Sequence, residues 1–193
     1  LNGVEVARRN AGASGGFKYR DAFAAMGTPS HTEATTTPYL RTETINLGAA
    51  NVRLVAGTNT LAIHALNYLE NTSLHNQTTN VLTGINNSNN FYFKGDLKLS
   101  GATLAANNTA WKFLPGVVEP SGGFYDPTLI FQAKLNVPWG RPSFDDSLWS
   151  TGAAPFGAGS PPGGVTLGTN LTAQIPGQAS SLYCRIVFNA TAA

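Results

Sequence analysis

Every strand-like apolar run in the sequence is short, and this feature most constrains the fold. The clearest runs are residues 60–66, 91–93, 97–99, 111–114 and 181–189. Gly, Asn, Pro and Thr bound these runs, and such residues are typical of turns. Apolar residues nowhere keep a helical spacing over about ten positions. The pattern therefore predicts an all-β fold, an antiparallel β-sandwich or jelly roll.

The bulk composition excludes several classes of protein. Hydrophobic residues make up 42% of the 193 and charged residues 11%, which is too apolar for a disordered chain. The 12 basic and 10 acidic residues are scattered, so we expect no binding to nucleic acid. No run approaches the roughly 20 apolar residues of a membrane span. The single cysteine, Cys184, excludes an intrachain disulfide and is interpreted as a small buried hydrophobe.

Low charge with many Asn and Thr residues favours a secreted, extracellular or cell-surface protein. The chain begins at Leu1 inside a strand-like phrase, which we interpret as a fragment or a processed chain. Asn-x-Ser/Thr triplets would mark glycosylated surface loops in a eukaryotic secreted protein, whereas in a bacterial protein they arise by chance. The six candidates for glycosylation are Asn71, Asn76, Asn86, Asn107, Asn170 and Asn189.

Local patterns predict individual elements. Asn2-Gly3 predicts a hairpin turn, with Leu1 ending one strand and residues 4–8 forming the next. Alternation also predicts strands at residues 42–47 and 51–55, and residues 67–90 are expected to form a long surface loop.

The run Asp145-Asp146-Ser147 predicts a turn in which short side chains cap backbone N–H groups. Phe144, Leu148 and Trp149 around it are then expected to point inward.

Five segments resemble the galactose-binding-like sandwiches that accompany β-galactosidases and recur in large bacterial surface proteins. Residues 1–9 and 54–64 are similar to the hairpin and the strand of the back half of that domain. Three further segments are similar to the front half of the domain, namely Trp111-Lys112-Phe113-Leu114, Ser143-Phe144-Asp145-Asp146-Ser147-Leu148-Trp149 and residues 183–188. The resemblance implies a jelly-roll fold, and calcium, held by Asp145 and Asp146, is a structural ion that it allows.

The order of these segments is reversed relative to one such domain. We therefore expect residues 1–100 to be the back half of one sandwich, 101–110 a linker, and 111–193 the front half of another. Either the two halves fold together as a circular permutant, or a neighbouring chain or repeat completes each half. In the second case, strand edges for assembly are predicted at Leu1, Val4, Val6, Leu182, Cys184, Ile186 and Phe188.

The sequence predicts that the chain is not an enzyme. His31, His64 and His75 have no metal-ligand or nucleophile-elbow spacing. Asp145 and Asp146 are the only adjacent carboxylates, and a role in the turn is favoured over catalysis.

A carbohydrate site would use exposed rings with nearby polar groups. Ring packing onto the fold is the alternative for these residues. The candidates are Trp139, Tyr125, Asp126 and Arg141 in one group and Tyr68 and Asn67 in a second.

Three functions follow from this reading. The first is a carbohydrate-binding or adhesive module that holds a glycan or polysaccharide. The second is a self-associating subunit or repeat of an extracellular filament, joined by exchange of half-domains. The third is an accessory domain of a glycoside hydrolase.

Overall fold

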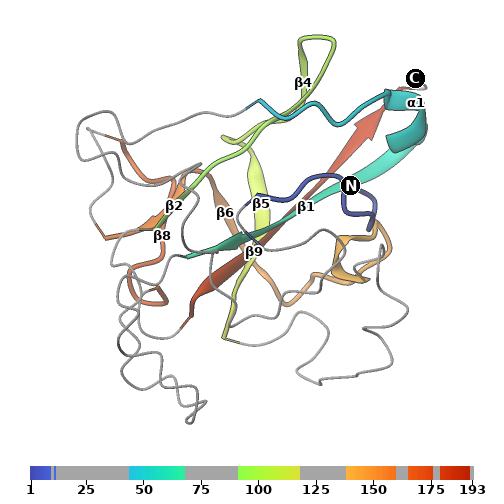
Figure 1. Cartoon of the computed structure of the whole chain (residues 1–193). Helices are drawn as coiled ribbons and strands as arrows, with labels where there is room; N and C mark the ends of the chain where they lie inside the picture. Colours follow the sequence, from blue (N-terminus) through green and yellow to red (C-terminus); the bar gives the residue numbers. More distant parts are fainter. Residues whose placement is uncertain are drawn as a thin grey trace.

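The computed structural model describes residues 1–9, 11, 44–67, 91–117, 138–159, 165–175 and 179–191. Within these ranges the regular structure is almost entirely β-strand (Figure 1). The exceptions are the four-residue helix α1 (Ala50–Arg53) and the 3-10 turn η2 (Pro138–Gly140). The prediction of an all-β fold is therefore confirmed for the described part of the chain.

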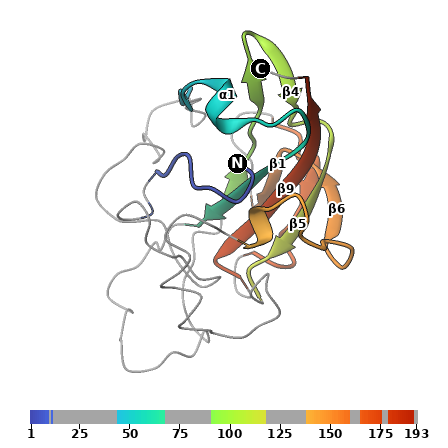
Figure 2. The ribbon, with the colours of Figure 1, turned by 90° about the vertical axis from the view of Figure 1, so that its right-hand side faces the viewer.

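The largest sheet has four antiparallel strands in the order β1-β9-β5-β6. These strands are β1 (Gly57–Leu66), β9 (Ser181–Ala190), β5 (Ala110–Pro115) and β6 (Ser150–Ala153). The β1–β9 ladder runs the whole length of both strands, from Gly57 opposite Ala190 to Leu66 opposite Ser181. Strands that are far apart in the sequence, β1 and β9, thus lie side by side in one sheet (Figure 2).

Two smaller sheets complete the described strands. β2 (Phe91–Phe93) pairs antiparallel with β7 (Phe156–Ala158), which pairs parallel with β8 (Thr169–Asn170). β3 (Leu97–Leu99) and β4 (Ala102–Ala105) form a hairpin. The segment 101–110, expected as a linker, therefore contains a paired strand. Its turn is made by Ser100 and Gly101, both with positive φ.

The main core joins residues of the four-stranded and the three-stranded sheets. Phe113 of β5 lies against Phe156 of β7, with ring centroids 5.3 Å apart. Leu182 and Cys184 of β9 are fully buried in the same cluster. This core is built from the alternate residues of β9, as the sequence pattern predicts.

The predicted turn at Asn2-Gly3 is confirmed, but the strand after it is not. Asn2 and Gly3 have φ of 54° and 84°, and the N–H of Val4 donates to the carbonyl of Leu1 at 3.0 Å. Residues 4–8 carry only an isolated bridge at Val4. The side chain of Asn2 bonds instead to β1, where its Oδ1 accepts from the N–H of Thr60 at 2.8 Å.

The strand expected at residues 51–55 is wrong, because most of this segment is helix α1 and the turn after it. The buried side chain of Asn59 explains the difference. Its Oδ1 accepts from the N–H of Val55 at 2.9 Å, and its Nδ2 donates to the carbonyls of Val55 and Gly57 at 2.8 and 2.9 Å. These bonds hold the residues just before β1 in a turn, so that they do not extend the strand. Residues 44–47 of the predicted strand 42–47 are also irregular.

Candidate functional site

A group of polar and aromatic side chains lies on the outer face of the four-stranded sheet. Arg185 projects from β9 on this face and is only 1% exposed. Its Nη1 donates to the carbonyl of Phe144 at 3.1 Å and to the carboxylate of Asp146, and its Nη2 donates to the carbonyl of Arg141 at 2.8 Å. The guanidinium carbon also lies 5.3 Å from the centre of the Phe144 ring. Arg185 therefore fixes residues 141–146 onto the sheet.

Aromatic rings fill the space beside Arg185. Tyr183 of β9 packs edge-on against Trp139, with centroids 5.1 Å apart, and Trp149 contacts both rings. His64 of β1 stacks on Tyr183 with centroids 4.1 Å apart. We call this group, Trp139, Trp149, Tyr183 and His64, the outer cluster. It is a second small core, separate from the core between the sheets.

His64 is held in its neutral form. Burial, with a smaller contribution from the charge of Arg8, lowers the pKa of His64 from 6.5 to about 3. Its Nε2 is shielded from solvent and has no hydrogen-bond partner in the part of the chain that the structure describes. A side chain in this state is a packing element rather than a proton carrier at neutral pH.

For Trp139 the structure agrees with ring packing onto the fold, the alternative to an exposed ring that stacks on a sugar. Its side chain is 7% exposed and lies among the rings of the outer cluster. Sequence reasoning left both open because neighbours such as Tyr183 and His64 come from distant strands.

Leu148 is the opposite case. It was expected to point inward, yet it is 96% exposed. The N–H of Trp149 donates to the carbonyl of Asp146 at 2.9 Å, which closes a tight turn with Leu148 at its corner. Phe144 and Trp149 do point inward, as predicted.

The two adjacent carboxylates have different partners. Asp145 Oδ1 accepts from the N–H of Ser147 at 2.9 Å, which confirms the predicted capped turn and lowers the pKa of Asp145. The carboxylate of Asp146 accepts from Arg185. Within the described ranges, no group of three or more His, Cys, Asp or Glu side chains could hold a metal ion. These contacts give the calcium prediction no support.

Two of the remaining predicted sugar ligands, Asn67 and Arg141, lie in the described part of the chain. Asn67 is buried at 3% exposure, and its N–H donates to the carbonyl of Ser180 at 2.8 Å. Arg141 is exposed. Tyr68, Tyr125 and Asp126 lie outside the described residues.

The residues predicted as assembly edges are mostly inside the molecule. Strand β9 pairs with β1 along its whole length and with β5 at residues 182–185, so Leu182 and Cys184 have a neighbouring strand on both sides. Ile186 and Phe188 pair with β1. Whether these residues take part in assembly stays a prediction. Leu1 is buried in the main core and Val6 packs against it. Val4 is partly buried beside the turn at Asn2.

Three of the six Asn-x-Ser/Thr triplets can be placed. Asn170 and Asn189 are exposed and Asn107 is partly buried. Asn71, Asn76 and Asn86 lie outside the described residues. Whether any of them is glycosylated stays a prediction.

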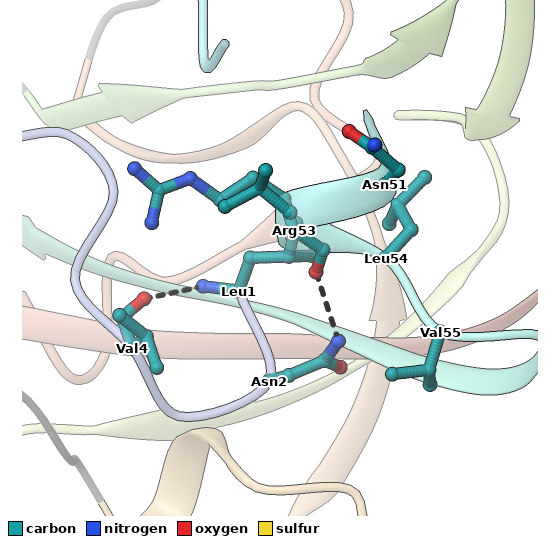
Figure 3. A pocket seen from close by; sticks show the side chains of 8 residues that line it. Leu1, Asn2, Val4, Asn51, Arg53, Leu54 and Val55 are labelled. Atoms are coloured by element: carbon teal, nitrogen blue, oxygen red, sulfur yellow. Dashed lines mark hydrogen bonds between the residues drawn. The ribbon is translucent and has the colours of Figure 1, made fainter. Parts of the chain in front are cut away.

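A hollow of about 250 Å³ lies between the first turn and helix α1 (Figure 3). Its lining is largely apolar and consists of Leu1, Asn2, Val4, Asn51, Val52, Arg53, Leu54 and Val55. The α-amine of Leu1 donates to the carbonyl of Val4 at 2.8 Å, and burial lowers its pKa to about 6. Nδ2 of Asn2 donates to the carbonyl of Arg53 at 3.2 Å, which joins the two walls. No motif in the sequence indicated this hollow.

The thiol of Cys184 should be unreactive in the folded protein. Its side chain is fully buried, and burial raises its pKa well above the usual value. We expect an aromatic disulfide reagent at about pH 8 to modify it at least about 100-fold faster in denaturant than in buffer. Equal rates in the two conditions would contradict the burial of β9.

No helix in the described ranges is both long and apolar enough to cross a membrane. Searches against protein-family models, curated proteins and solved structures found no match to this chain.

Proposed function

We propose that this chain is a non-catalytic, extracellular β-sandwich module of the galactose-binding-like type that binds carbohydrate. One observation carries the proposal. The sequence segments that resemble this class come together in pairs around a single sheet, although they are far apart in the sequence.

The contacts between the segments are specific. The turn at Asn2 bonds to Asn59 and Thr60 of the second segment, with Asn2 Nδ2 donating to Asn59 Oδ1 at 2.9 Å. Arg185 in the last segment bonds to Asp146 in the run 143–149. The ten-residue ladder of β1 with β9 then connects the predicted back and front halves. This arrangement favours a permuted domain over two halves completed by neighbours.

The chemistry of the described side chains favours binding over catalysis. His64 is enclosed with a pKa of about 3, and the guanidinium of Arg185 is occupied by two carbonyls and a carboxylate. Cys184 is buried with a raised pKa. Groups that are buried or fixed in this way serve as structural elements.

The test is a carbohydrate-binding screen of the whole chain against immobilised glycans and polysaccharides. Isothermal titration of the best ligand should give a Kd between about 1 μM and 1 mM, a range typical of weak specific sites. The variants Arg141→Ala and Tyr125→Ala should each weaken binding about tenfold, because each removes a predicted polar or stacking contact.

The control separates binding from folding. Trp139→Ala is unsuitable because it opens a cavity in the outer cluster. Val187→Ser alters an exposed side chain on β9 and should leave the affinity unchanged. A chain that is folded by circular dichroism yet binds no glycan would overturn the proposed function.

A further inference from the structure

We infer that this protein associates with a second copy of itself by inserting Leu148 of one copy into the hollow beside α1 of the other. The inference goes beyond carbohydrate binding and does not depend on it. It rests on three observations: an exposed apolar knob, an apolar socket of sufficient size, and charges of opposite sign beside them.

The knob is Leu148, at the corner of a rigid turn. Its side chain is 96% exposed, although it follows the capped turn of Asp145 and precedes the buried Trp149. The backbone below it is fixed by Arg185, which bonds to Phe144 and Asp146. A large apolar side chain on a fixed turn loses little entropy on binding, which is the property of an interface anchor.

The socket is the hollow between the first turn and α1 (Figure 3). Five of its eight lining residues are apolar, namely Leu1, Val4, Val52, Leu54 and Val55. Val52 and Val55 are 71% and 56% exposed, so the rim is apolar as well. A cavity of roughly 150 Å³ accepts a ligand as large as benzene. The hollow of about 250 Å³ therefore has room for a leucine side chain.

Charges beside the two surfaces are complementary. Asp145 is exposed next to the knob, and its carboxylate forms no ion pair with a residue in the described part of the chain. Arg53 extends from α1 along the socket on the side of Leu1 and Val4 (Figure 3). Its Nε donates to the carbonyl of Leu47 at 3.4 Å, and it too has no carboxylate partner within those ranges. A second copy that seats its Leu148 in the socket brings Asp145 towards Arg53.

Sedimentation velocity of the whole chain, at concentrations up to about 1 mM, tests the inference. The wild-type chain should associate reversibly, and Leu148→Ser should weaken association at least about tenfold, because an anchor side chain is lost. Val187→Ser is the matched control, since it also removes an exposed apolar side chain and should leave association unchanged. Circular dichroism and thermal melting check that each variant is folded.

Reversing the charges beside the knob and the socket tests the inference independently of Leu148. Asp145→Lys and Arg53→Glu should each weaken self-association, and an equimolar mixture of the two variants should associate again. The mixture restores attraction between the reversed knob and the reversed socket. A wild-type chain that is monomeric over the whole range overturns the inference. So does an equal effect of Leu148→Ser and Val187→Ser, or a mixture that stays monomeric.

Discussion

Replacing Arg185 with alanine should lower the free energy of unfolding by about 3–5 kcal/mol, the usual result of removing one partner of a buried ion pair. The side chain is 1% exposed and bonds to Asp146 and to the carbonyls of Phe144 and Arg141. Its loss leaves these acceptors without their donor and opens a space under the Phe144 ring. Urea unfolding followed by tryptophan fluorescence measures the effect, because Trp139 and Trp149 lie beside this segment.

Two variants show whether the effect comes from the guanidinium. Arg141→Ala removes an exposed side chain but keeps the backbone carbonyl that accepts from Arg185, so the free energy of unfolding should change by no more than about 0.5 kcal/mol. Asp146→Asn removes the charge but leaves the carbonyl bonds, and an intermediate loss of about 1–2 kcal/mol is expected. If Arg185→Ala costs no more than Arg141→Ala, Arg185 does not fix residues 141–146.

The sequence predicted those elements that short-range chemistry determines. The turn at Asn2 and Gly3 follows from two residues that tolerate positive φ, and strand β9 follows from strict alternation of Leu182, Cys184 and Phe188. The capped turn at Asp145 follows from a short acceptor two residues before Ser147. Both turns are closed by contacts within a few residues, and β9 follows from the pattern of its own side chains.

The errors came from contacts between distant segments. The side chain of Asn59 bonds to the backbone of Val55 and Gly57 and so holds the turn that precedes β1, which the alternation of side chains does not predict. Trp139 is covered by rings from β1 and β9, so its flanking Pro and Gly were a poor guide to its exposure. The role of Arg185 was also missed, because its partners are about 40 positions earlier in the chain.

The outer cluster should make the fold sensitive to acid. The pKa of His64 is about 3 in the folded protein and 6.5 by default, so between these values the unfolded chain binds more protons. The stability that the folded protein gains from keeping His64 neutral is therefore complete above about pH 6.5 and is lost as the pH falls toward 3. Each pKa unit corresponds to about 1.4 kcal/mol, so unfolding free energy should decrease by roughly 2–3 kcal/mol between about pH 6 and pH 4.

His64→Phe is the informative control for this acid sensitivity. It keeps a ring in place to stack on Tyr183 but cannot take up a proton, so its urea midpoint should change much less over the same pH range. The α-amine of Leu1 has a lowered pKa of about 6, so it also makes stability depend on pH, but mainly above pH 6. Between pH 6 and pH 4 its effect on the free energy of unfolding is therefore small and the same in the wild type and the variant. A wild-type chain whose His64 titrates near pH 6.5 by NMR while folded would contradict the prediction. That result would mean that the ring is open to water, and that Trp139 and Tyr183 do not enclose it.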